Sequence, residues 1–401
     1  MSIFPVELIE NILAHVYAEY RPLENPVVLH QCALVCRTWR TISQSFIFSE
    51  ILLSASHLDN KIKILRGNSC LHRYIRTLWL GNDGGICGVE AILNVLPRVQ
   101  ELYVLEYGLA TVLIDGPAAE RVLGNLTSLA LEGSPIPFWI GTFYYCHSLR
   151  ELKMRNSTFD VADTQKFPRN RAITRLHSLH ISGTASSHME ILQWMLTPQC
   201  PFDLTALTTF RTSDRSDELE SYAWIQEIVK LCAPTLQDIM IDPPTSIAGP
   251  NPSLTSGSLL YPSTLFNLRV ITISIMQERY DYTNYIPWMT TFFSLLPIFN
   301  RLEEIRIPYM FRDHFDELEE GRIQIDLYDL EALDTTLTSS HLELKRVVFA
   351  IYKHSRCEFK ILGPLLRELL PRLNEKGVLE IEISTTLGHM AEHDCWWRLA
   401  S

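Results

Sequence analysis

The sequence has no long apolar run, no second ligand pair near Cys32 and Cys36 that would complete a metal site, and no excess of basic residues. The apolar stretch at 288–299 is too short to cross a bilayer and is broken by Pro297, so we expect no transmembrane segment. The nine cysteines are scattered and odd in number, and no secretory hydrophobic region follows Met1, which predicts a reducing compartment, cytoplasmic or nuclear. A net charge of -11 argues against a broad nucleic-acid-binding surface.

Catalytic and metal-binding motifs are also scarce. The glycine-rich segment 81–88 lacks the Lys-Ser or Lys-Thr of a phosphate-binding loop, and we interpret it as a turn. No Gly-x-Ser-x-Gly motif occurs. His389 and His393 lie four residues apart beside Cys395, but their order is not that of a metalloprotease. We expect no catalysis, no metal and no cofactor, and keep an enzyme built on residues 389–395 only as an alternative.

A short apolar pattern returns from residue 75 onward. In each copy two residues separate the first and second apolar positions, and one residue separates the second and third. The middle positions Leu78, Leu102 and Leu129 lie 24 and 27 residues apart, which is the spacing of leucine-rich repeats. All the middle positions are Leu78, Leu102, Leu129, Leu152, Leu179, Ile239, Ile271, Ile305, Val347 and Ile381, with a degenerate copy at 204–207.

Helical segments separate these copies. Residues 225–232 and 361–373 have apolar side chains at helical spacing, and several such segments stop at a proline shortly before the next copy. About eleven strand–helix units predict an α/β fold with a parallel sheet backed by helices, and a closed barrel would need about eight. Because no asparagine ladder follows the strands, we expect an open, irregular leucine-rich-repeat solenoid at 75–385, after a helical linker at 51–74 and before a tail at 386–401.

The first fifty residues predict a separate three-helix domain. Pro5 suits the first turn of a helix, and Glu7 lies near the positive end of its dipole. Apolar residues follow at helical spacing, and a second apolar series runs from Val28 to Phe46 after a polar loop. So small a unit is marginal alone, so a partner or the following domain must cover part of its apolar surface.

The segment FPVELIENIL at 4–13 and the segment LVCRTW at 34–39 together resemble the F-box. The resemblance covers about an eighth of the chain, and Phe4 stands where the family usually has leucine. It implies docking on a Skp-family adaptor, which links the protein to a cullin RING ubiquitin ligase. The adaptor-binding residues that it implies are Phe4, Pro5, Leu8, Ile12, Leu13, Leu34, Val35, Cys36 and Trp39. The alternative is that these residues form the core of a helical cap on the first repeat.

The middle residue of each expected strand faces away from the helices, because successive side chains of a strand point to opposite faces. This predicts a row of side chains on the concave side of the sheet. We assign target binding to five of them, since aromatic residues and arginine are common in binding hot spots: Trp79, Tyr103, Lys153, His180 and Arg306. The alternative is that the aromatic residues stack on neighbouring repeats and see little solvent.

The sequence therefore predicts a non-catalytic substrate receptor of an SCF-type ubiquitin ligase, monomeric within that complex, with no nucleic-acid or membrane partner. Its repeats would bind an unknown protein target. The alternative is a leucine-rich-repeat scaffold or interaction protein outside any ligase. Two segments interrupt the repeats: 243–258, whose Pro, Gly and Ser content predicts a surface loop, and the acidic region 313–334, which we interpret as a solvated helix face or a patch for a basic partner.

Overall fold

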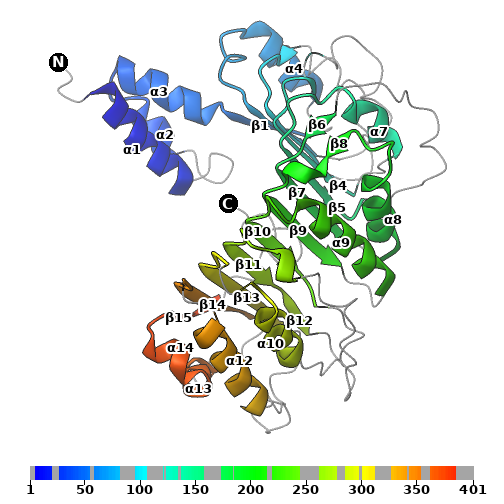
Figure 1. The fold of residues 1–401 in the computed structure, drawn as a ribbon. Helices are drawn as coiled ribbons and strands as arrows, with labels where there is room; N and C mark the ends of the chain where they lie inside the picture. Colours follow the sequence, from blue (N-terminus) through cyan, green and yellow to red (C-terminus); the bar gives the residue numbers. More distant parts are fainter. Residues whose placement is uncertain are drawn as a thin grey trace. The chain divides into compact units, whose positions relative to one another are not determined.

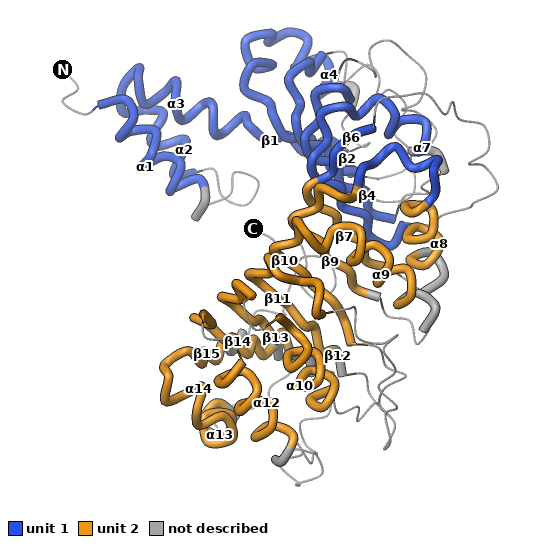
Figure 2. Tube along the Cα trace, in the orientation of Figure 1, with its two compact units in different colours: residues 1–176, 197–203 blue, residues 177–196, 204–401 orange. Residues whose placement is uncertain are grey.

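The computed structural model describes two compact units of α/β architecture, in which parallel strands are backed by helices (Figures 1 and 2). Unit 1 comprises residues 1–176 and 197–203, and unit 2 comprises residues 177–196 and 204–401. The described residues are 5–19, 27–54, 58–81, 95–105, 121, 123–133, 137–157, 173–183, 185–214, 219–243, 262–277, 285–297, 300–311, 327–340, 343–353 and 362–384. Phe4, the loop at 244–258, residues 313–326 and the cluster at 389–395 lie outside them.

Unit 1 begins with three helices, α1 (Val6–Glu19), α2 (Val27–Cys32) and α3 (Arg37–Ile47). A parallel ladder follows, made of β1 (Glu50–Ser54), β2 (Thr77–Gly81), β3 (Glu101–Leu105), β4 (Ser128–Glu132) and β5 (Glu151–Arg155). Helices α4 (Leu58–Gly67) and α7 (Pro137–Phe143) belong to the connections, and β6 (Thr174–Arg175) pairs with β8 (Phe202–Asp203) in a small second sheet.

Unit 2 continues the strand–helix alternation. Its parallel ladder contains β7 (Ser178–Gly183), β9 (Thr209–Asp214), β10 (Asp238–Ile241), β11 (Val270–Ile273), β13 (Glu304–Phe311), β14 (Arg346–Lys353) and β15 (Leu379–Ser384), with β12 (Ile275–Gln277) also paired to β13. The α-helices are α8 (Ala185–Met195), α9 (Leu219–Cys232), α10 (Ile286–Ser294), α12 (Leu327–Ser340), α13 (Leu362–Leu369) and α14 (Pro371–Glu375), and two short 3-10 turns are η3 (Leu204–Ala206) and η6 (Pro262–Thr264).

Burial of the repeated apolar positions holds the strands to their helices. Leu78 and Leu80 of β2 are completely buried, and so are Ile305 and Ile307 of β13. The apolar face of α9 is buried as well, as the spacing at 225–232 predicts. The expected parallel sheet backed by helices is confirmed. Within the described ranges, no helix has the length and apolar character needed to cross a membrane.

The structure places three elements differently from the sequence interpretation. The ladder starts at β1, inside the segment expected to be a helical linker, and Leu53 there is fully buried. The degenerate copy at 204–207 is a 3-10 turn, and the strand follows it at β9 because Phe210 fills the buried position. The helical segment at 361–373 is two helices, since Pro371 starts a new one.

A repeated backbone arrangement sets the level at which each strand begins. The carbonyl of Arg76 accepts the N–H groups of Gln100 and Glu101, at 2.8 and 3.0 Å. The carbonyl of Gln237 accepts those of Arg269 and Val270 in the same way, at 2.8 and 2.9 Å. Successive strands therefore start at equivalent residues. As a result, side chains at equivalent positions of neighbouring strands form straight rows across each ladder.

Candidate functional site

The three N-terminal helices, called the head here (residues 5–19 and 27–49), have a small core of their own. Ile9 and Leu13 lie one turn apart on α1 and are fully buried against Leu29 of α2 and Ile42 of α3. Trp39 is half-buried and packs against this core. Leu13 and Trp39, two of the residues assigned to adaptor binding, therefore contribute to the internal packing of the head.

Helix α1 carries a second apolar stripe that the core does not use. Its sequence places apolar residues in pairs at 8–9 and 12–13, and only one member of each pair faces inward. Leu8 and Ile12 remain 43% and 41% exposed, whereas Ile9 and Leu13 are buried. The apolar arc of α1 is thus wider than its own bundle requires, and the outer stripe is available to another molecule.

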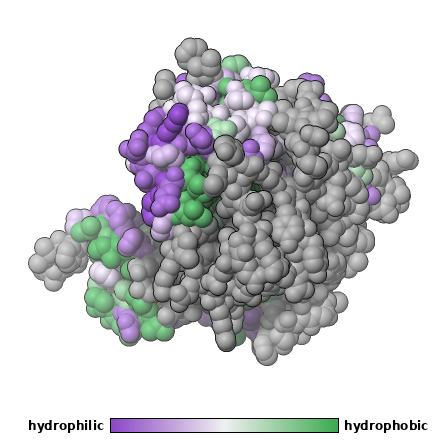
Figure 3. Space-filling model, turned by 90° about the horizontal axis from the view of Figure 1, so that it is seen from below, coloured by the Kyte–Doolittle hydropathy of each residue, from purple (hydrophilic) through white to green (hydrophobic). Residues whose placement is uncertain are grey.

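The turn between α2 and α3 carries the most exposed apolar side chains of the head. Leu34 is 78% exposed and Val35 is 64% exposed, and Cys36, which precedes α3, is also exposed. The turn is well formed, because the N–H groups of Leu34 and Val35 donate to the carbonyls of Gln31 and Cys32 at 3.0 and 3.2 Å. Figure 3 shows apolar residues on the surface of the small lobe at the left, which is the head.

The head residues assigned to adaptor binding differ in how far they are buried. Pro5, Leu8, Ile12, Leu34, Val35 and Cys36 are exposed, Trp39 is half-buried and Leu13 is buried. Phe4 lies outside the described residues. The exposed six therefore contribute little to the core of the head, which is built from Ile9, Leu13, Leu29 and Ile42.

The head is joined to the ladder by a polar contact. The hydroxyl of Tyr17 donates to the carboxylate of Glu50 at the start of β1, and the hydroxyl of Ser49 donates to Tyr17 at 3.3 Å. Burial raises the pKa of Tyr17 well above its ordinary value, and the bond to Glu50 raises it further, so the phenol stays protonated and keeps donating.

Trp79 and Tyr103 lie directly opposite each other on β2 and β3, on the face of unit 1 that points away from the buried leucines. Their rings stack, with centroids 3.8 Å apart and planes inclined by 10°. Both side chains are half-buried. This geometry matches the stacked alternative for the aromatic residues, while each residue keeps part of its surface exposed.

A row of acidic and hydroxyl side chains runs beside this aromatic pair, two residues earlier on each strand. Its members, in register from β1 to β5, are Glu50, Thr77, Glu101, Ser128 and Glu151. Thr77 donates to Glu101 at 3.2 Å, and Ser128 donates to Glu151 at 2.8 Å. Burial raises the pKa of Glu101, and the nearby carboxylates of Glu151 and Glu50 add to this rise.

Lys153, the cation assigned to target binding on this face, already forms an ion pair within the chain. Lys153 is largely buried, and its ammonium lies 3.0 Å from the carboxylate of Glu151. The same face also holds Arg155, which pairs with Glu132 on β4 at 3.5 Å. Sequence reasoning passed over these carboxylates, although the alternation Glu-x-Lys on β5 places Glu151 and Lys153 on one face.

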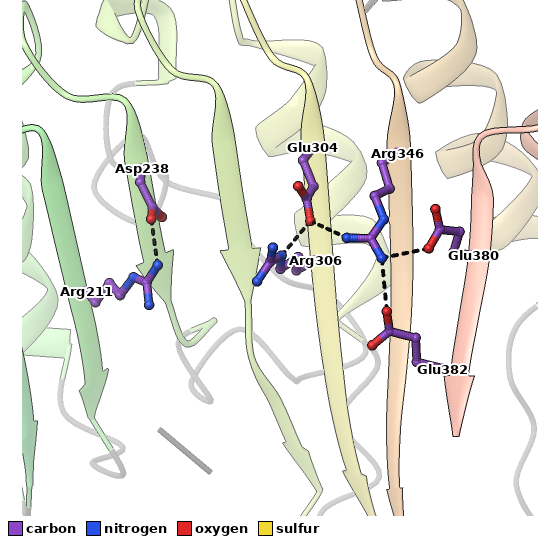
Figure 4. Close-up of polar contacts among 7 residues, drawn as sticks. All are labelled: Arg211, Asp238, Glu304, Arg306, Arg346, Glu380 and Glu382. Carbon is purple, nitrogen blue, oxygen red and sulfur yellow. Dashed lines mark hydrogen bonds and ion pairs between the residues drawn. The ribbon is translucent and has the colours of Figure 1, made fainter. Parts of the chain in front are cut away.

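Unit 2 has a corresponding set of charged side chains on its strands (Figure 4). The guanidinium of Arg346 on β14 contacts Glu304 on β13 at 3.1 Å and both Glu380 and Glu382 on β15, at 2.7 and 3.0 Å. Arg306 pairs with Glu304, two residues earlier on its own strand, at 2.5 Å. These contacts join three neighbouring strands through their side chains.

The first part of the unit 2 row is also charged. His180 on β7 lies in register with Arg211 on β9, and Arg211 pairs with Asp238 on β10 at 2.6 Å. The five residues assigned to target binding therefore lie on two ladders: Trp79, Tyr103 and Lys153 on unit 1, and His180 and Arg306 on unit 2. The first three lie in one row on a single face, in register through Ala130, and form the more coherent candidate.

No protein-family model and no curated protein matches this chain. The candidate site therefore rests on the chemistry of its own residues. In the described part of the chain, no group of three or more His, Cys, Asp or Glu side chains could hold a metal ion.

Proposed function

We propose that the protein is an F-box-type substrate receptor, whose head docks on a Skp-family adaptor of a cullin RING ubiquitin ligase and whose leucine-rich-repeat-like units bind a protein target. In this function the chain forms and breaks no covalent bonds itself, works in the cytoplasm or nucleus, and is monomeric within the complex. Ubiquitin transfer belongs to partner subunits.

The observation that carries the proposal is the outer apolar surface of the head. Leu8 and Ile12 on α1 and Leu34 and Val35 on the following turn are all exposed, although the head already has a packed core. Exposed apolar area is unfavourable in water, at about 25 cal/mol per Å², so such a surface on a small bundle is typical of a protein-binding site. These same residues carry the resemblance to the F-box.

Co-purification of the full chain with a Skp-family adaptor tests the proposal. Val35→Asp places a charge on the exposed turn and should abolish the complex. Ile64→Asp is the matched control, since Ile64 on α4 is 58% exposed, outside the head. A folded wild-type chain that fails to bind the adaptor, or equal binding by both variants, would refute the docking role.

A scaffold outside any ligase is the second candidate, and the packing of Leu13 and Trp39 in the core of the head favours it. In a pure cap these residues complete the fold and nothing more. The two candidates differ in what the adaptor brings with it: a receptor co-purifies with adaptor and cullin together. A chain that binds the adaptor but never the cullin is a scaffold.

A further inference from the structure

The polar face of unit 1, meaning the side of β1–β5 that carries Trp79 and Tyr103, has more carboxylates than cations. Among the described residues it holds four carboxylates and two cations, which are Glu50, Glu101, Glu132, Glu151, Lys153 and Arg155. The two cations are taken up by Glu151 and Glu132. Two carboxylates remain without a cation within ion-pair distance in the described part of the chain, Glu50 and Glu101.

These two carboxylates differ in their surroundings. Glu50 accepts the hydrogen bond from the Tyr17 hydroxyl and so belongs to the junction with the head. Among the described residues, Glu101 accepts a hydrogen bond from the Thr77 hydroxyl alone, at 3.2 Å, although it is half-buried. The Lys153 ammonium, which is bound to Glu151, lowers the pKa of Glu101 by less than burial raises it. The charge of Glu101 therefore remains only partly compensated, because burial penalises it.

Glu101 also lies next to the aromatic pair. It is two residues before Tyr103 on the same face of β3, and it is in register with Thr77, two residues before Trp79. Two residues along a strand span about 6.5 Å, so the carboxylate and the rings are within reach of one long side chain. This combination of an aromatic surface and an uncompensated carboxylate is complementary to a guanidinium or an ammonium group.

A phosphate fits this face poorly. Both cations that would receive it are already paired, Lys153 with Glu151 at 3.0 Å and Arg155 with Glu132 at 3.5 Å, and both are largely buried. The remaining carboxylates would repel an anion. The charge of the face therefore favours a basic partner.

We propose that unit 1 recognises an arginine- or lysine-bearing segment of its protein target, with the basic side chain packed on the Trp79–Tyr103 pair and its charge paired with Glu101. This deepens the proposed receptor function and rests on it for its biological meaning. The binding itself needs no adaptor, so it is measured on the purified full chain alone.

The probe is a fluorescent peptide, acetyl-(Gly-Arg)4-amide, measured by anisotropy in about 0.15 M salt. Comparison peptides replace arginine by glutamate or by phosphoserine. Glu101→Gln keeps the shape of the side chain and removes its charge, and should weaken the arginine peptide about tenfold. Glu10→Gln is the control, because Glu10 is exposed on α1 and its loss changes the net charge equally. Glu10→Gln should change affinity less than about twofold.

Trp79→Leu and Glu101→Lys complete the test. Trp79→Leu should weaken the arginine peptide about fivefold, because a leucine side chain has no aromatic face. Glu101→Lys should reverse the preference in favour of the glutamate peptide, an outcome that a merely unfolded variant cannot give. Equal affinity for arginine and glutamate peptides, unchanged affinity after Glu101→Gln, or tighter binding of the phosphoserine peptide would each overturn the inference.

The experiments distinguish failure of the basic-segment inference from failure of the proposed receptor function. If the wild-type chain binds its adaptor but not the arginine peptide, the basic-segment inference is wrong and the docking role stands. If the chain binds the peptide but no adaptor, the polar face is a binding surface and the receptor function is wrong.

Discussion

Replacing Leu34 and Val35 together by alanine should weaken adaptor binding strongly while leaving the fold intact. Burying a leucine or valine side chain completely contributes about 1.5–3 kcal/mol. Exposed fractions of 78% and 64% leave about 1–2 kcal/mol per side chain for a partner to gain. The double variant should therefore lose about 2–4 kcal/mol of binding free energy, or roughly 30- to 700-fold in Kd.

The same substitution should barely affect the free energy of unfolding. Surface side chains that make few internal contacts change stability by about 0.5 kcal/mol or less. Leu13→Ala gives the contrast, because Leu13 is fully buried in the same motif and its truncation should destabilise the head by about 2–5 kcal/mol. The motif thus separates into residues that bind and residues that fold.

Isothermal titration calorimetry with the adaptor and chemical denaturation of the full chain measure the two effects. Ile64→Ala is the control for loss of an exposed apolar side chain elsewhere in unit 1. The reasoning is refuted if the double variant binds as tightly as the wild type. It is also refuted if its unfolding free energy falls as far as that of Leu13→Ala, since these side chains would then be packed inside the fold.

Three further outcomes are expected. The carboxylate of Asp334 on α12 accepts the N–H groups of Arg372 and Leu373 at the start of α14, both at 2.9 Å. Asp334→Ala should therefore lower the free energy of unfolding, measured by chemical denaturation, by about 1–3 kcal/mol. Replacement of the exposed Glu331 by alanine should leave it unchanged. Burial raises the pKa of the Cys146 thiol to about 12, so at pH 8 iodoacetamide should modify exposed Cys70 and leave Cys146 unmodified in the folded chain, as peptide mass spectrometry can show. The raised pKa of Glu101 means that the folded chain binds its proton more tightly than the unfolded chain, so stability falls as pH rises through the carboxyl range. Glu101→Gln should therefore unfold at a higher denaturant concentration than wild type at pH 7, with the difference disappearing near pH 3.

The strands were predictable because their signal is local. A buried middle position and a buried position two residues later recur with almost every strand, as Leu102 and Val104 illustrate. The strand β1 carries the same pattern, Phe48, Ile51 and Leu53, within the stretch that the sequence interpretation gives to the head and the helical linker. In β9 the middle and last positions of the pattern are Phe210 and Thr212. Because Thr212 is not apolar, a search for three apolar residues does not find this strand.

The charged rows could not be predicted from spacing alone. Arg346 meets Glu304 and Glu380 across 42 and 34 residues, and these separations depend on the lengths of two different strand connections. Cross-strand neighbours follow from register, which the apolar pattern fixes only once the ladder is known. The alternation of side chains within one strand can be read from the sequence, as it can for Glu304 and Arg306. It shows that a cation predicted to face a target can instead form an ion pair within its own strand.

The head and the polar face of unit 1 share one physical feature, which is why both are read as binding surfaces. Each contains groups that the described part of the chain leaves poorly compensated. These are apolar side chains in water, such as Val35, and the half-buried Glu101 carboxylate, which has no ion-pair partner among the described residues. Neither arrangement stabilises the free chain, and the acidic one reduces its stability at neutral pH. The groups differ in kind, so one partner must supply apolar area and the other positive charge. An adaptor covering the head could not satisfy Glu101, and a basic segment on the ladder could not cover Leu34. Two chemically distinct partners on one chain are what a receptor requires.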